Sequence, residues 1–82
     1  MADTGETVLD LRGFQCPLPV LKTRHRLRQM AVGDVIVVLS DDPLAGVDIP
    51  HLCAEKNQDL LDQQMLEGDA RRFTIRRTEA KI

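Results

Sequence analysis

Aromatic side chains and a surplus of charge are both missing from this chain. It has no tryptophan or tyrosine and only two phenylalanines, and its formal net charge is −2. A general nucleic-acid binder usually has an excess of basic residues, together with aromatic side chains on which bases stack. The composition therefore argues against general nucleic-acid binding. Because bulky side chains that could wall a pocket are few, we expect specificity to come from protein docking.

Long apolar segments are missing too. The longest purely apolar run, Val35 to Leu39, is far too short to cross a bilayer. The N-terminus lacks the succession of charged, apolar and small residues that marks a secretory signal. We therefore expect a soluble protein located in the cytoplasm, with no membrane partner.

Cysteine is scarce, and the chain has only Cys16 and Cys53, separated by much of its length. This does not resemble the disulfide framework of a secreted domain. His25 and His51 could join the cysteines in a zinc site, but structural zinc normally uses close ligand pairs at turns. His51 and Cys53 would point about 200° apart on a helix, which is two residues at about 100° each. We predict no metal site and no bound cofactor.

The stretch Cys16-Pro17-Leu18-Pro19 places a thiol directly before two prolines. Proline is tolerated in the first turn of a helix, so the motif predicts a helix that begins at Pro17 with Cys16 as its cap. The positive end of a helix dipole favours a thiolate, which predicts a reactive Cys16 with a lowered pKa. The alternative is a small apolar residue that fills a gap in the core. Packing is the interpretation that we favour for Cys53, inside the second predicted helix.

The apolar pattern predicts the element order β-α-β-α-β-β in one domain, residues 1–82, with a core over about 7–77 and frayed ends at 1–6 and 79–82. The second helix should be regular only from Ile49, because Pro50 must break or kink it. The hairpin should turn at Gly68-Asp69. The predicted strands are 7–12, 35–39, 59–66 and 71–77, and the predicted helices are 17–31 and 43–56.

Right-handed crossovers would place both helices on one face of a mixed four-stranded sheet, which gives an α/β two-layer sandwich. The first two strands are then parallel. The loop that holds Cys16 and the loop that holds Asp41 and Asp42 would therefore emerge at the same sheet edge, where α/β folds usually place their sites.

Several motifs agree in order and spacing with one family. They are Leu9-Asp10, Gly13, Cys16-Pro17-Leu18-Pro19-Val20, Met30, Gly33-Asp34, Asp41-Asp42-Pro43, Asp48-Ile49-Pro50 and Cys53. The chain resembles the TusA (SirA/YedF) family of small sulfur-carrier proteins over about residues 8–77. It departs from the family pattern at Phe14, where leucine is common, and at Asn57-Gln58, where Gly-His or Glu-His often follows the second helix. Both departures bear on partner choice.

The resemblance implies a fold similar to the C-terminal domain of translation initiation factor 3, and a Cys16 that carries sulfane sulfur as a persulfide. The donor would be a cysteine desulfurase or a rhodanese, and an acceptor protein would receive the sulfur. The family serves tRNA thiolation, cofactor assembly and sulfur oxidation. Whether such a carrier counts as an enzyme is partly convention, and sulfurtransferase is the term we would use.

Other residues near the motif are candidates for positioning or docking. Gly13, Pro17 and Pro19 would position the thiol. We expect a monomer when free, and a docking surface made of Leu18, Leu21, Lys22, Arg24, Arg26, Asp41 and Asp42. The alternative function is a regulatory module that contacts protein or RNA through the basic first helix without thiol chemistry.

Overall fold

The computed structural model describes residues 6–82, apart from the side chain of Glu6. Fraying was expected for residues 1–6, of which residues 1–5 lie outside the described residues and Glu6 begins β1. The elements follow the expected order: β1 (Glu6–Asp10), α1 (Leu18–Gln29), β2 (Val35–Ser40), α2 (Ala45–Glu55), β3 (Asp59–Met65) and β4 (Arg71–Arg76).

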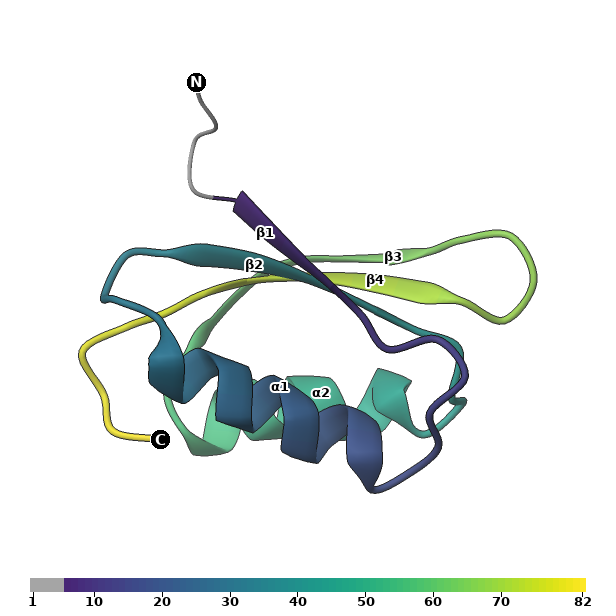
Figure 1. Ribbon diagram of the computed structural model, residues 1–82, viewed down its shortest axis with the longest axis horizontal. Helices are drawn as coiled ribbons and strands as arrows, with labels where there is room; N and C mark the ends of the chain where they lie inside the picture. The colour runs from purple at the N-terminus through teal and green to yellow at the C-terminus, as the bar shows by residue number, and fades with distance from the viewer. Residues whose placement is uncertain (1–5) are drawn as a thin grey trace.

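The strands form one mixed sheet in the order β1-β2-β4-β3. β1 runs parallel to β2, while β4 is antiparallel to both β2 and β3. Both helices cover the same face of this sheet, so the chain is a two-layer sandwich (Figure 1). The predicted topology is confirmed, including the hairpin that turns between Leu66 and Ala70.

The core lies between the sheet and the helices. Every second residue of β2 and β4 faces the helices, as the alternation of side chains along a strand requires. Ile36, Val38, Phe73 and Ile75 are fully buried there. The helices and the residue that follows β1 complete the cluster, which includes Leu11, Leu27, Ala45, Ile49, Leu52 and Cys53.

Helix α2 differs from its prediction, because it is continuous from Ala45 and carries Pro50 in its interior. Proline removes one hydrogen bond of the helical ladder. The buried side chains of Ala45, Ile49 and Leu52 anchor α2 on both sides of Pro50. Tertiary packing therefore outweighs the local cost of the proline, and the expectation of a regular helix only from Ile49 was wrong.

The C-terminal residues also differ from their prediction, because they pack against the domain. Ile82 contacts the core, and its backbone oxygen accepts a hydrogen bond from Arg28 Nε at 3.2 Å. The buried Gln58 binds the same segment: it donates to the Ala80 oxygen at 3.3 Å and accepts from the Thr78 N–H at 2.7 Å. Residues 79–82 are thus held against the domain, and the role of Gln58 is structural, because its side chain binds this segment.

Candidate functional site

The segment before α1 presents Cys16 to solvent. Helix α1 begins at Leu18, its N-cap is Pro17, and no side chain caps it. Cys16 therefore lies one residue before the cap, joined to Pro17 by a cis peptide bond, and the prediction that it caps a helix beginning at Pro17 was wrong. The two prolines differ in burial: Pro17 is exposed, whereas Pro19, in the first turn of α1, is buried.

Two aspartates after β2 hold the Cys16 loop in place. Asp42 Oδ2 accepts a hydrogen bond from the Cys16 N–H at 2.6 Å, and Asp41 Oδ1 accepts one from the Gly13 N–H at 3.0 Å. Gly13 adopts φ +95°, a conformation that favours glycine. The expected meeting of the two loops at one sheet edge is confirmed.

Asp42 does not offer a docking surface. Its side chain is buried, and its second carboxylate oxygen accepts a hydrogen bond from the Leu44 N–H at 3.3 Å. Placing Asp42 among the partner contacts was therefore wrong, because the carboxylate is used within the chain to join the Cys16 loop to the start of α2. Asp41 is exposed and stays a candidate for docking.

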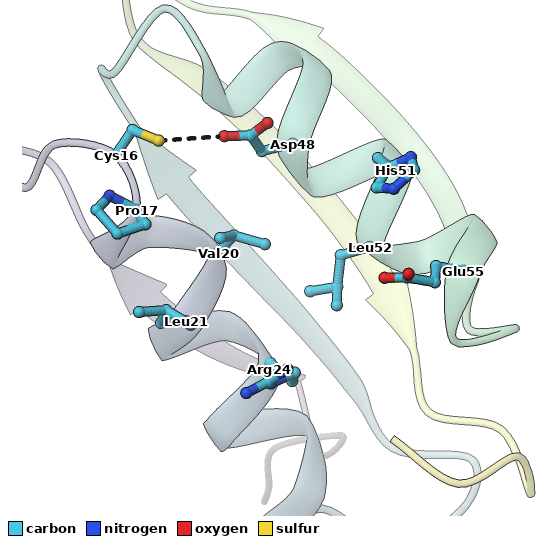
Figure 2. A pocket seen from close by; sticks show the side chains of 9 residues that line it. All are labelled: Cys16, Pro17, Val20, Leu21, Arg24, Asp48, His51, Leu52 and Glu55. Atoms are coloured by element: carbon cyan, nitrogen blue, oxygen red, sulfur yellow. Dashed lines mark hydrogen bonds between the residues drawn. The ribbon is translucent and has the colours of Figure 1, made fainter.

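The thiol itself faces a third carboxylate. Cys16 Sγ donates a hydrogen bond to Asp48 Oδ2, with the two atoms 3.5 Å apart (Figure 2). Partial desolvation, this hydrogen bond, and the negative charges of Asp48 and Asp42 raise the pKa of the Cys16 thiol above its ordinary value. The prediction of a lowered pKa was wrong, because partial desolvation and the nearby carboxylates favour the thiol over the thiolate.

Asp48 was not among the predicted site residues, although it belongs to the Asp48-Ile49-Pro50 motif that supports the family resemblance. A further signal was its position, since an aspartate five residues after Pro43 lies in the first turn of α2. The parallel β1–β2 pairing brings the loop after β1 beside the loop that leads into α2.

A groove of about 280 Å³ opens beside the sulfur, between α1 and α2. Val20 and Leu52 point toward each other across it, and Asp48 and Cys16 close one end (Figure 2). The charged and polar side chains that line the remainder of the groove are Arg24, His51 and Glu55. The groove forms where α1 and α2 pack side by side, and the expectation that specificity comes from protein docking stays a prediction.

The outer surface of α1 combines apolar and basic groups. Leu18 and Leu21 are 43% and 44% exposed, and Lys22 Nζ lies 4.8 Å from the centre of the Phe14 ring. A second hollow, of about 500 Å³, lies between β1 and α1 and is lined in part by Phe14, Leu21, Lys22 and Arg26. Arg24 lies on the other side of Leu21, in the groove beside Cys16.

Cys53 lies in the core, where 2% of its surface is exposed, and burial raises the pKa of its thiol to about 11. The packing role predicted for it is confirmed. Within residues 6–82, no three His, Cys, Asp or Glu side chains are grouped so that they could hold a metal ion. In the same part of the chain, no helix has the length and apolar character needed to cross a membrane.

Comparison with known proteins identifies relatives of this chain in fold and in sequence. A crystal structure of a SirA-like protein from Desulfitobacterium hafniense has the same fold, with a TM-score of 0.78 at 20% identity, covering 89% of this chain and 99% of that one. A protein of Archaeoglobus fulgidus named "Putative sulfur carrier protein" is 37% identical over 68 residues, which are 83% of this chain and 88% of the relative. Residues 7–77 match the family described as Sulfurtransferase TusA, and the chain belongs to that family.

Proposed function

We propose that this chain is a sulfur carrier, which accepts sulfane sulfur on Cys16 from a donor protein and passes it to an acceptor protein. The observation that carries the proposal is the exposed thiol in a chain of the TusA sulfurtransferase family. The A. fulgidus relative, named as a sulfur carrier, supports it.

Loading would proceed by nucleophilic exchange. The Cys16 thiol loses its proton, and its sulfur attacks the outer sulfur of a persulfide on the donor, such as a cysteine desulfurase or a rhodanese. A new S–S bond forms at Cys16 while the donor's S–S bond breaks, and the donor cysteine leaves as a thiol. Unloading is the same exchange, with the acceptor's nucleophile attacking the outer sulfur on Cys16.

Docking would use the surface of α1 that surrounds the thiol. Leu18 and Leu21 give exposed apolar area beside Cys16. Lys22, Arg24 and Arg26 add positive charge along the same helix. Apolar anchors near the centre of an interface mainly set dissociation, whereas charges at its rim mainly raise the association rate. We therefore place the leucines at the centre of the interface and the cations at its rim, facing an acidic partner surface.

The acceptor would belong to tRNA thiolation, cofactor assembly or sulfur oxidation, the processes that the family resemblance implies. An exposed cysteine on a small domain suits such delivery, because two partners can reach the same atom in turn. The buried Cys53 cannot be reached in this way in the folded chain.

The test is a transfer assay with a persulfide-forming cysteine desulfurase and cysteine as its substrate. Intact mass should show one added sulfur atom on the wild type and on Cys53→Ala, and none on Cys16→Ser. Loading of Cys16→Ser at the wild-type rate would rule out the carrier role assigned to Cys16. Cellular function retained by Cys16→Ser would instead favour a regulatory module that works without thiol chemistry.

A further inference from the structure

Building on the proposed carrier function, we propose that Asp48 sets how readily Cys16 gives up its sulfur. Its carboxylate stabilises the unloaded thiol and destabilises the loaded persulfide, so that the balance is tilted toward release. The observation behind this is the contact between Cys16 Sγ and Asp48 Oδ2 at 3.5 Å, made by a residue from α2 that lies 32 positions along the chain.

In the unloaded state, Asp48 interacts favourably with the sulfur. The thiol donates its proton into a hydrogen bond with the carboxylate. A hydrogen bond to a charged acceptor is stronger than one between neutral groups. Loss of the proton would replace this hydrogen bond with repulsion between two negative charges, which agrees with the direction in which the pKa of Cys16 is shifted.

In the loaded state, the same carboxylate interacts unfavourably with the sulfur. A persulfide is more acidic than a thiol, so it is largely an anion at neutral pH. Its Sγ carries no proton for Asp48 to accept, and its negative charge lies on the outer sulfur, about 2.05 Å from Sγ. Loading therefore exchanges a hydrogen bond for repulsion at short range.

The other charged groups around the sulfur act less directly. Asp42 also adds negative charge, but its two oxygens accept backbone N–H groups of Cys16 and Leu44. Arg24, His51 and Glu55 line the same groove, although none of the three has a hydrogen bond to the thiol. Asp48 is the side chain whose interaction with the sulfur changes from an attractive hydrogen bond to electrostatic repulsion when the sulfur is loaded.

The exchange that Asp48 would tilt is balanced in atoms and charge. A small persulfide anion and the Cys16 thiol give the Cys16 persulfide anion and a small thiol. One S–S bond forms at Sγ, one breaks in the small persulfide, and the proton moves from Sγ to the leaving sulfur. The reaction needs no further oxidant or reductant.

The experiment equilibrates the protein with glutathione persulfide and glutathione, a pair too small to depend on the docking surface. Intact mass gives the ratio of loaded to unloaded carrier. Asp48→Asn should raise this ratio about three- to tenfold, the order expected when one neighbouring charge is removed near a protein surface. Asp62→Asn, the same change on the edge strand β3, should leave the ratio at the wild-type value.

Two further readouts separate this role from a merely structural one. In Asp48→Asn, the midpoint of Cys16 alkylation against pH should fall, while the melting temperature stays within a few degrees of the wild type. Asp48→Glu, which keeps the charge, should return both the ratio and the midpoint toward the wild-type values.

The outcomes are distinguishable. If wild-type Cys16 loads but Asp48→Asn gives the wild-type ratio, or if Asp62→Asn raises the ratio equally, the role of Asp48 is overturned and the carrier function stands. If wild-type Cys16 does not load at all, the carrier function itself is overturned.

Discussion

Cys16 and Cys53 are the same residue in two environments, and the contrast shows what makes a cysteine useful here. Cys16 is exposed in the segment before α1, whereas Cys53 lies on α2 and is buried in the core. The pKa of each thiol is raised, by burial at Cys53 and by desolvation with neighbouring carboxylates at Cys16. The direction of the pKa shift therefore does not distinguish the two thiols. Their solvent exposure does distinguish them, and Cys16 is the cysteine that a partner can reach.

The largest expected effect is a difference in alkylation rate. In the folded protein, a small reagent should modify Cys16 on the order of a thousand times faster than Cys53, because the buried thiol reacts only through local or global opening. Mass spectrometry of digested protein measures both rates. In strong denaturant the two rates should converge. A Cys53 that reacts as fast as Cys16 in the folded protein would contradict its place in the core.

The second effect is on stability at alkaline pH. The folded state holds the Cys53 proton more tightly than the unfolded chain, whose thiol has a pKa of about 8.5. This contribution to stability is therefore fully present below about pH 8.5 and is lost as pH rises through about 11. Over that range, the wild type should lose about 2 kcal/mol more of its unfolding free energy than Cys53→Ala.

Urea unfolding at pH 8 and pH 10.5 measures this difference. Cys16→Ser serves as the matched control, because it keeps the buried thiol and should retain most of the wild-type loss. Equal pH dependence in the wild type and Cys53→Ala would show that the buried thiol does not contribute.

Changes around Cys16 should affect docking and leave stability nearly unchanged. Reversal of Lys22 and Arg26 to Glu should slow association with the donor protein about tenfold at low salt and reduce its salt dependence, because rim charges steer encounter. Leu18→Asp should weaken binding at every salt concentration. Surface-coupled binding kinetics measure both effects.

Matched controls for docking lie elsewhere on the surface. Lys81→Glu reverses an exposed charge in the C-terminal segment, and Val8→Asp changes an apolar side chain that is 59% exposed on β1. Both should bind the donor as the wild type does. If the α1 variants also bind and load at the wild-type rate, α1 lies outside the interface.

The smallest expected effect is the pH profile of Cys16 itself. Its alkylation rate should rise with pH through a midpoint modestly above the pKa of a free cysteine, about 8.5. The direction follows from the desolvation and the carboxylates that raise the pKa of this thiol. A midpoint below the free-cysteine value would restore the idea that a helix terminus activates Cys16.

The sequence predicts the fold well because the dominant signals are local. A β-branched apolar run marks β2, and the alternation around Phe73 and Ile75 marks β4. The exposed thiol and its Cys-Pro motif were also found in this way. The raised pKa of the thiol was not predicted, because the two neighbouring carboxylates belong to residues that are 26 and 32 positions away in the sequence. The residues next to Cys16 in the sequence indicate only the nearby helix terminus, whereas Asp42 and Asp48 approach the thiol only in the folded chain.

The measurement that tests the account most directly is the location of the sulfur. Wild-type protein is incubated with a cysteine desulfurase and cysteine, remaining persulfides and thiols are trapped by alkylation, and the peptides are mapped by mass spectrometry. The account predicts one extra sulfur atom on the peptide that carries Cys16, and an unmodified sulfur at Cys53. Sulfur found on Cys53, or on neither cysteine while the desulfurase turns over, would contradict it.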